Sequence, residues 1–482
     1  MTRKSALVLA LLAVAAVSAS FAADRSKPPA AGPPKPLQLP AVTKLTLGNG
    51  LPVFLAEVKE VPVVEAVLVV RTGAAHDPDG RRGLAAMVAG MLDEGAGKLD
   101  ALSLADEIEY LGAELATAAG WDAVTVRLHV PSARLDEALP LLADVVLRPR
   151  FPDAELTRLR KEALTSLLQA RDDPRRLAGT ALAQAVFGAS HRYGHALGGD
   201  AASLSAITVS DLSSFHSTHF RPGNAALVVA GDFGPGVASR LEASFGSWPA
   251  GGSVLAPLLP PPASREKGPK IWLVDKPGAP QSAIRIGRLG PPRAIADYPA
   301  LEVANTLLGA MFTSRLNDNL REQHGYTYGA RSSFDYRRSG GAFVAGADVA
   351  TQVTAPAVTE FLKELARIRT PATAEEVERA RAFLALGQGS EFETTRQIAA
   401  KIVDQVVYGL PDDEYSAFVP KAMAVGPADL VRAVSRRIDP ADLAIVVVGD
   451  REAAGGPLRN LGLARVRFLT VDEVMGPEPK IE

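Results

Sequence analysis

The strongest constraint on how this chain folds is that its sequence repeats itself. Residues 211–232 and 429–450 share one order of signals: a helix start, a helix, a proline turn, an apolar strand and a final Gly-Asp pair. Pro222 matches Pro440 and Gly231 matches Gly449, and the offset between the copies is the same at each matched position. A register that holds over this length indicates an internal duplication that gives two halves of similar architecture.

Weaker matches extend the repeat toward the N-terminus of each half. A Val-Pro pair at 61–62 and an Ala-Pro pair at 279–280 each precede a predicted apolar strand, and they are related by the same offset. The proline-rich stretch between the halves is typical of a semi-rigid linker. We therefore expect a signal peptide at 1–22, a Pro/Ala-rich leader at 23–40, an N-terminal domain at 41–249, a linker at 250–269, a C-terminal domain at 270–470 and a tail at 471–482.

The first half mixes two hydrophobic periods. Alternating apolar residues predict strands, and apolar residues three or four apart predict helices. Hydrophobic residues make up 47% of the chain and charged residues 22%, which is typical of a protein that buries a full core. Helices gathered against a mostly antiparallel sheet give each half an α+β fold. The predicted strands cover 51–56, 63–71 and 123–130, and the predicted helices cover 83–93, 103–111, 135–147 and 153–171.

The N-terminus indicates export from the cytoplasm. Arg3 and Lys4 precede an apolar run at 6–17, and residues 20–22 offer a small-x-small cleavage pattern. A membrane anchor is the alternative, but the run is shorter than the roughly 20 apolar residues that a bilayer crossing needs. No later segment offers an uninterrupted apolar run of that kind. We expect a periplasmic or secreted protein with no membrane span after signal cleavage.

Composition excludes several classes of site. There are 0 cysteines, so disulfides, iron–sulfur clusters and cysteine-based zinc sites are absent. The 52 Lys and Arg residues balance 54 Asp and Glu residues, which gives no general attraction to nucleic acid. The turn-rich loop at 73–80 lacks the Lys-Ser/Thr pair of a phosphate-binding loop. No serine lies in a G-x-S-x-G nucleophile motif.

The histidines do not form a convincing metal site. The pair His191–His195 has ligand spacing, but the intervening Arg-Tyr-Gly predicts a loop. The pair His216–His219 lies at a predicted helix end, where a histidine suits the negative pole of the helix dipole. Neither pair has an acidic residue at a suitable third position. We expect His76 to be solvated and His129 to lie on a strand face.

Four short stretches, in a fixed order, carry a resemblance to a known family. With the duplicated halves, they resemble the pitrilysin-type inverzincin metallopeptidases, which include insulin-degrading enzyme and the mitochondrial processing peptidases. The resemblance covers essentially the whole mature chain and implies two homologous peptidase-like domains. The stretches are Arg71-Thr72-Gly73 followed by Gly83-Leu84-Ala85; Arg171-Asp172-Asp173-Pro174; His191-Arg192-Tyr193-Gly194-His195; and Leu320-Arg321-Glu322-Gln323-His324-Gly325-Tyr326-Thr327-Tyr328.

The zinc motif of that family is lost in the first half. In active members the Gly-Leu-Ala stretch opens a helix with H-x-x-E-H, in which two histidines bind zinc and the glutamate activates water. Here the two ligand positions are Ala86 and Gly90, and the position of the base is Ala89. The neighbourhood expected to hold the third ligand, 165–168, contains no acidic residue. The resemblance therefore implies a degenerate zinc site and no metal or other cofactor in this chain.

The second half keeps a different part of the family's chemistry. In active members an arginine and a tyrosine, seven residues apart, reach from the second half toward the zinc of the first. Arg321 and Tyr328 keep this spacing, and Gly325 lies between them. The resemblance implies that the Tyr328 phenol stabilises a tetrahedral oxyanion and that the Arg321 guanidinium holds substrate carbonyls. An arginine at a solvated helix end and a tyrosine in a sheet core is the alternative interpretation.

Exported bacterial relatives occur as pairs in which one chain carries zinc and the other carries the Arg/Tyr pair. The resemblance therefore implies that this chain is the non-zinc subunit of a heteromeric periplasmic metallopeptidase. It would be inactive alone, with zinc in its homologous partner and an unfolded peptide as substrate. The alternative is a non-catalytic scaffold or peptide-binding protein of the same fold. A free-standing hydrolase with another nucleophile has no supporting Ser/His/Asp pattern.

Overall fold

The structure is a computed structural model that describes residues 32, 39–259 and 268–481. The chain divides into two units, Met1–Pro36 and Leu37–Glu482. The predicted signal peptide at 1–22 and most of the leader at 23–40 lie outside the described residues, so the fold is that of the second unit. Within the described ranges, we find no helix with the length and apolar character that crossing a bilayer requires.

Each half of this unit contains a six-stranded, mostly antiparallel sheet. Fully buried apolar strands form the centre of each sheet, and shorter, more exposed strands form its edges. In spatial order the first sheet consists of β1 (Val42–Thr46), β2 (Pro52–Glu57), β8 (Ala225–Gly231), β3 (Val63–Val70), β7 (Val124–Pro131) and β6 (Glu114–Ala119). The second sheet consists of β14 (Val466–Leu469), β9 (Lys270–Asp275), β13 (Ala444–Gly449), β10 (Gln281–Leu289), β12 (Ala342–Ala350) and β11 (Arg331–Asp335).

The two sheets repeat each other strand by strand. In both, the second and third strands are parallel and the next three pairings are antiparallel. The first strand differs, since β1 is antiparallel to β2 whereas β14 is parallel to β9. The two-domain α+β prediction is confirmed, and the repeat holds as predicted. The predicted domain boundaries stay predictions.

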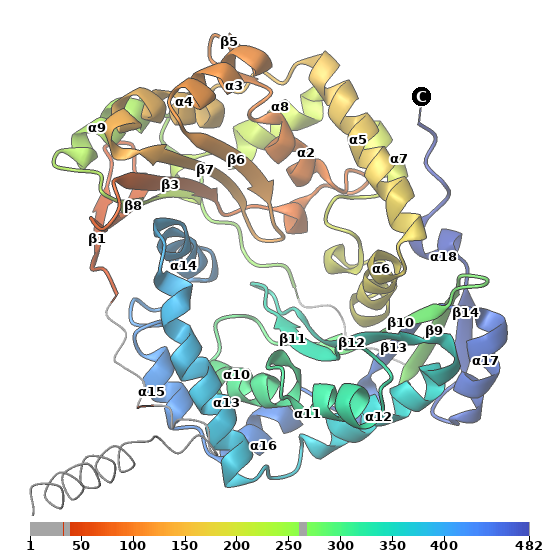
Figure 1. The fold of residues 1–482 in the computed structure, drawn as a ribbon. Coiled ribbons are helices and arrows are strands. Elements are labelled where there is room, and N and C mark those ends of the chain that lie inside the picture. Colours follow the sequence, from red (N-terminus) through yellow and green to blue (C-terminus); the bar gives the residue numbers. More distant parts are fainter. Residues whose placement is uncertain (1–31, 33–38, 260–267, 482) are drawn as a thin grey trace, which may run out of the picture. The chain divides into compact units, whose positions relative to one another are not determined.

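Helices pack on the outer face of each sheet, either directly or through other helices (Figure 1). In the first half they are α2 (Leu84–Met91), α3 (Ala101–Tyr110), α4 (Leu135–Leu147), α5 (Asp153–Asp172), α7 (Ala201–Ala206), α8 (Val209–His219) and α9 (Val237–Phe245), and the small hairpin β4 (Gly95–Ala96) and β5 (Leu99–Asp100) precedes α3. In the second half they are α10 (Tyr298–Asn305), α11 (Arg315–Asn317), α12 (Thr354–Arg367), α13 (Ala374–Gly387), α15 (Phe418–Met423), α16 (Pro427–Ser435) and α17 (Arg451–Asn460). α5 and α13, for example, pack through other helices.

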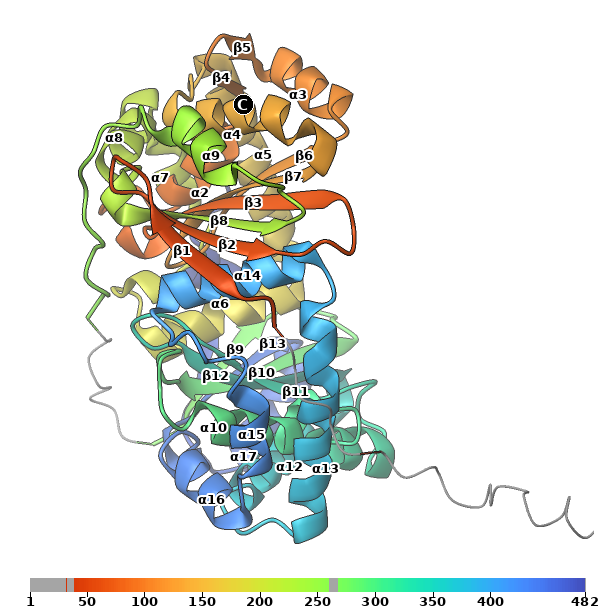
Figure 2. The same ribbon diagram turned by 90° about the vertical axis from the view of Figure 1, so that its left-hand side faces the viewer.

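One helix of each half packs on the sheet of the other half. α6 (Pro174–Phe187) belongs to the first half in sequence, but its buried leucines and alanines join Val446 and Val448 of the second sheet in one apolar cluster. α14 (Thr395–Tyr408) belongs to the second half and packs its Ile398 and Ile402 against β3 and β8 of the first sheet. Figures 1 and 2 show both helices on the sheet faces that look toward the other half.

The C-terminal tail also returns to the first half. Its helix α18 (Val471–Met475) packs on α6, and the Gln184 side chain donates a hydrogen bond to the Val474 carbonyl at 2.7 Å. Arg171 donates to the Gly476 carbonyl at 2.6 Å and also contacts Asp472. These contacts, together with the exchanged helices, join the halves into one unit.

Candidate functional site

The helix that carries the degenerate zinc motif, α2, begins in a tightly constrained turn. Gly83 has φ +87°, and a Cβ atom there would lie 2.4 Å from the Gly198 carbonyl oxygen, so only glycine fits. The buried Asp77 carboxylate accepts hydrogen bonds from the amides of Gly83 at 2.7 Å and Ala85 at 2.9 Å. Burial raises the pKa of Asp77 to about 7, although these amides act in the opposite direction. The Gly-Leu-Ala stretch at 83–85 is thus needed to begin helix α2.

The positions that would hold zinc are lined by apolar groups. Ala89 is buried, Ala86 and Gly90 are half-buried, and α5 packs against this helix. A Cβ atom on Gly90 would meet the Leu159 side chain at 3.7 Å, and Leu167 of α5 packs against the same core. Methyl groups and leucine side chains do not ligate zinc, so these residues do not fit the metal.

No group of three or more His, Cys, Asp or Glu side chains able to hold a metal ion occurs in the part of the chain that the structure describes. His191 caps a short 3-10 turn by accepting from the Tyr193 amide at 3.1 Å, and His216 lies 2.8 Å from the Val146 carbonyl oxygen. His129 lies on β7, as predicted, with Nδ1 2.9 Å from the buried Glu65 carboxylate.

The expectation that His76 is solvated is wrong. The side chain is half-buried, and its Nε2 lies 3.3 Å from the Ala256 carbonyl oxygen. Residues of the predicted linker therefore lie against the first half at this point. Burial lowers the pKa of His76, which favours the neutral imidazole.

The second half presents Arg321 and Tyr328 on an irregular segment between α11 and β11. The π-helical turn η6 (Asp318–Gln323) carries Arg321, and π-turns are frequent at functional sites. Gly325 has φ +65°, and its amide donates to the Arg321 carbonyl at 3.0 Å, which ends the turn. The Tyr328 side chain is 95% exposed, so it does not lie in the sheet core. The Arg321 side chain is 35% exposed.

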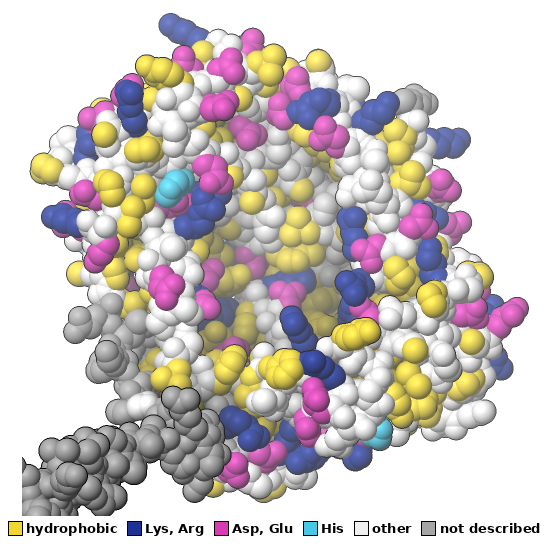
Figure 3. Space-filling model, in the orientation of Figure 1, with side chains coloured by type: hydrophobic (Ala, Val, Ile, Leu, Met, Phe, Trp, Pro, Cys, Tyr) yellow, Lys and Arg dark blue, Asp and Glu magenta, His cyan; other side chains and the backbone are white. Residues whose placement is uncertain are grey.

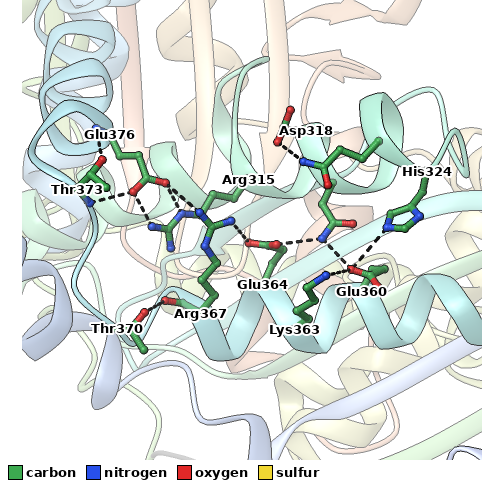
Figure 4. A network of polar contacts seen from close by, with 12 residues as sticks. Arg315, Asp318, His324, Glu360, Lys363, Glu364, Arg367, Thr370, Thr373 and Glu376 are labelled. Carbon is green, nitrogen blue, oxygen red and sulfur yellow. Dashed lines mark hydrogen bonds and ion pairs between the residues drawn. The ribbon is translucent and has the colours of Figure 1, made fainter.

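A buried ion pair holds the start of this segment (Figure 4). The Arg315 guanidinium donates two hydrogen bonds to the Glu376 carboxylate, at 2.8 and 2.9 Å, and both side chains are largely buried. Glu376 also accepts from the Thr373 amide at 2.9 Å in the capping box of α13. These donors, Arg315 first, lower the pKa of Glu376 to about 2 against the effect of burial. The carboxylate is therefore ionised at any physiological pH.

A second set of polar contacts holds the π-turn itself (Figure 4). The Asn319 amide donates to Glu364 at 2.9 Å and to Glu360 at 2.8 Å, both on α12. His324 Nε2 lies 3.8 Å from Glu360, and Lys363 donates to the same carboxylate at 3.0 Å. The segment is thus attached to α12 and α13 by side chains whose geometry is fixed.

A single buried asparagine ties the two ends of the segment together. The Asn317 amide donates to the Phe312 carbonyl at 2.8 Å, and its oxygen lies 3.3 Å from the Ala330 amide nitrogen as acceptor. Phe312 is 66% exposed, and its ring centroid lies 4.5 Å from the Arg321 Cζ atom. Figure 3 shows the face in view hollowed between the two halves, and Figure 1 shows β11, into which the segment runs, beside that hollow.

Reasoning from the sequence did not find the residues that support this segment. Thr373 and Glu376 have capping-box spacing, which is a visible signal for a helix start. Nothing in the sequence indicates that Glu376 also pairs with Arg315, because the two residues lie far apart along the chain. The role of Phe312 likewise depends on the turn that brings its ring under Arg321.

Comparison with known proteins identifies the family. A family model described as "Insulinase (Peptidase family M16)" matches residues 53–198, and one described as "Peptidase M16 inactive domain" matches residues 206–384. The chain belongs to the pitrilysin-type (M16) peptidase family. This match to the inactive domain, the similarity to a non-peptidase homolog and the apolar groups at the ligand positions indicate that the described part of the chain has no zinc site. A match of this kind is typical of a subunit that carries no zinc in a paired peptidase.

Relatives include both zinc proteases and a protein described as inactive. An uncharacterized zinc protease of Mycobacterium leprae is 28% identical, over 62% of this chain and 67% of its own length. A non-peptidase homolog of Helicobacter pylori is 25% identical, over 78% of this chain and 86% of its own. A crystal structure of a peptidase M16 inactive domain from Pseudomonas fluorescens superposes with TM-score 0.76 at 26% identity, over 85% of this chain and 98% of that one.

Proposed function

We propose that this M16 chain is the zinc-free subunit of a heteromeric peptidase and supplies Arg321 and Tyr328 to a homologous zinc-bearing partner. The observation that carries the proposal is the contrast between the two halves. The ligand positions on α2 hold only methyl groups and hydrogen, whereas Tyr328 is 95% exposed on a segment that buried polar contacts hold in place.

The two side chains suit distinct tasks in peptide hydrolysis. The partner's zinc site would supply the metal and its activated water. The Tyr328 hydroxyl would donate a hydrogen bond to the carbonyl oxygen of the scissile bond as negative charge develops there. The Arg321 guanidinium would donate to main-chain carbonyls of the peptide and so align it. An unfolded peptide would bind by adding a strand to a free sheet edge, as β6 and β11 each pair with only one neighbour among the described strands.

The site of action in this proposal is the periplasm or the exterior of the cell. The positively charged start, the apolar run and the small-x-small pattern of residues 3–22 carry this part of the proposal. N-terminal sequencing of the exported protein tests it, with cleavage near residue 22 as the expected result. A full-length N-terminus in a cytoplasmic fraction contradicts it.

The decisive experiment compares the chain alone with the chain paired with a zinc-bearing family member encoded in the same genome. We expect the isolated chain to hold no stoichiometric zinc and to cleave no fluorogenic peptide. In the pair, Tyr328→Phe should lower kcat about 100-fold or more, because it removes one donor to the oxyanion. Arg321→Ala should mainly raise KM, because it removes a contact to the bound peptide.

Tyr110 provides a matched control for the tyrosine. It is also exposed, at 72%, and lies on α3 in the first half. Tyr110→Phe should leave kcat and KM of the pair unchanged. Chelator-resistant cleavage by the isolated chain, or an unchanged rate with both Arg321→Ala and Tyr328→Phe in the pair, would refute the proposal.

A non-catalytic scaffold or peptide-binding protein is the second candidate. Two relatives favour it: the non-peptidase homolog of Helicobacter pylori, and a mitochondrial cytochrome b-c1 complex subunit 1 of Caenorhabditis elegans that is 22% identical over 86% of this chain and 89% of its own. A zinc-bearing homologue encoded beside this chain supports the paired peptidase. Stable association with a larger assembly, together with no effect of Tyr328→Phe on any peptidase activity, supports the scaffold.

A further inference from the structure

Phe312 is exposed on a short stretch whose other exposed residue is Thr313, between segments that are buried. Met311 and Ser314 are buried, and the segment from Arg315 to Asn317 is buried as well. The Phe312 side chain is 66% exposed and belongs to no apolar cluster of the described residues. An aromatic ring left in water at the surface of a fixed turn does not contribute to the core. The contact that distinguishes this ring from other exposed apolar side chains therefore lies outside the core.

That contact is the face of the ring under Arg321. The Arg321 Cζ atom lies 4.5 Å from the ring centroid, within the range of a cation–π interaction. The Arg321 Nε atom also lies 3.4 Å from Glu322, whose side chain is itself 56% exposed. The guanidinium thus has an aromatic ring on one side and Glu322 beside its Nε atom, which leaves its two terminal nitrogens to donate to a ligand.

Hydrogen bonds on the buried side of the turn fix the backbone of Phe312. Asn317 donates to the Phe312 carbonyl at 2.8 Å, and Arg315, on the buried side of the same turn, is held by Glu376. The backbone that carries the ring is therefore held in place, and the ring restricts the rotamers of the long Arg321 side chain. Without the ring, Arg321 would lose this conformational entropy when the peptide binds. Pre-organisation of this kind lowers the entropic cost of holding a peptide.

We propose that Phe312 is a positioning residue that holds the Arg321 guanidinium side-on and so presents its N–H groups to the main-chain carbonyls of an extended peptide. This inference rests on the proposed function, since it gives Phe312 its role through Arg321. Phe312 touches neither the scissile bond nor the metal in this account.

The test uses the pair with a zinc-bearing partner and one fluorogenic peptide. Phe312→Ala should raise KM about two- to fivefold and leave kcat nearly unchanged, which is the range of an exposed cation–π contact. Phe312→Tyr and Phe312→Trp should restore the wild-type KM, because they keep an aromatic face. Phe312→Leu keeps apolar bulk but has no such face, so it should behave like Phe312→Ala.

A double-mutant cycle separates the role through Arg321 from any other effect of the ring. In an Arg321→Ala background, Phe312→Ala should cause no further rise in KM. Tyr110→Ala is the matched control, because Arg134 lies over the exposed Tyr110 ring at 5.8 Å on the other half, and it should leave KM unchanged. Phe312 is exposed, so all variants should unfold at the temperature of the wild type.

The outcomes distinguish this inference from the proposed function. If Arg321→Ala and Tyr328→Phe impair the pair but Phe312→Ala matches the Tyr110→Ala control, the role of Phe312 is refuted and the proposed function stands. Rescue by Phe312→Leu, or an undiminished effect in the Arg321→Ala background, also refutes it. If neither Arg321→Ala nor Tyr328→Phe has an effect, the proposed function itself fails.

Discussion

Two segments at the same place in the repeat fold differently. Residues 101–110 and 319–328 are related by the offset that relates Pro222 to Pro440, and each runs toward an edge strand. In the first half the segment is the regular helix α3, capped by the Asp100 carboxylate, which accepts from the Ser103 amide. In the second half it is a π-turn followed by a loop that turns at Gly325.

The two segments differ in the number of polar side chains that stabilise their backbone. At the start of α3, one exposed cap is enough for a regular helix. The irregular segment of the second half instead requires Arg315, Asn319 and three carboxylates of α12 and α13 to hold it. Irregular backbone that the surrounding structure holds in place is typical of functional sites. At this place in the repeat, the first half therefore has a regular helix, and the second half has an exposed segment that buried polar contacts hold in place.

A large effect, similar to that of a core truncation, is expected from breaking the support of the irregular segment. Glu376→Gln should lower the free energy of unfolding by about 3 kcal/mol at pH 7, because it leaves the buried Arg315 without its counter-ion. Denaturant unfolding measures this. Glu375→Gln, on the exposed neighbour in the same helical turn, is the control and should change stability by less than about 0.5 kcal/mol.

The same pair predicts a dependence on pH. The pKa of Glu376 is lowered from 4.5 to about 2, so its ionised form contributes stability that is present above pH 4.5 and is lost as pH falls toward 2. The difference between wild type and Glu376→Gln should therefore be largest at neutral pH and shrink below pH 4.5. A difference that grows on acidification contradicts the assigned role.

A core truncation on the exchanged helix α6 tests whether the halves are independent. Leu177 is fully buried in the cluster formed with the second sheet, although it belongs to the first half in sequence. Leu177→Ala should lower the free energy of unfolding by about 2–5 kcal/mol, the cost of a cavity in a packed core. One cooperative transition that shifts as a whole is expected. Two transitions, with only the first-half transition shifted, would contradict the exchange.

A smaller effect is expected from a single position at which the two segments have different backbone conformations. Gly325 has φ +65° with no atom near its absent Cβ, so Gly325→Ala adds backbone strain without a clash and should cost about 1 kcal/mol. The matching position of the first half is Glu107 within α3, and Glu107→Gly should cost a similar amount for the opposite reason, the loss of helix propensity. In the pair, only Gly325→Ala should also alter KM, because it displaces the segment after Arg321.

The smallest effect is expected from an exposed ion pair between the halves. Arg396 of α14 donates to Glu114 of β6 at 2.7 Å, and both side chains are about half exposed. Arg396→Ala should lower the free energy of unfolding by less than about 1 kcal/mol. A loss as large as that of Leu177→Ala would mean that charge pairing, rather than apolar packing, joins the halves.

Sequence reasoning predicted most of the architecture because the signals are local or repeated. The helix from Leu135 to Leu147 has the predicted bounds, and the strands 63–70 and 124–131 recur at 281–289 and 342–350 in the second half. The site prediction at Arg321 and Tyr328 depends on motif spacing, and it stays a prediction. The structure adds that Tyr328 is exposed rather than buried in a sheet.

The supporting residues escaped prediction for a physical reason. Arg315 and Glu376 belong to separate elements, and an ion pair between them leaves no periodic pattern in either. The prediction for His76 is wrong because tertiary contacts half-bury its side chain, and one of them is with the Ala256 carbonyl oxygen, far along the chain. The sequence also does not predict that α6 and α14 each pack on the sheet of the other half, because an apolar helix face does not specify which sheet covers it.

The amino-acid sequence by itself determined the duplication, the α+β class and the loss of zinc ligands at Ala86, Ala89 and Gly90. The duplication follows from a repeated register, the α+β class from short-range periodicity, and the lost ligands from the resemblance to the family's motif. None of these needs knowledge of contacts in space. Only the tertiary structure decided that each half covers the other's sheet and that Phe312 lies under Arg321. Those arrangements depend on which surfaces meet, and burial and charge pairing between distant segments select them.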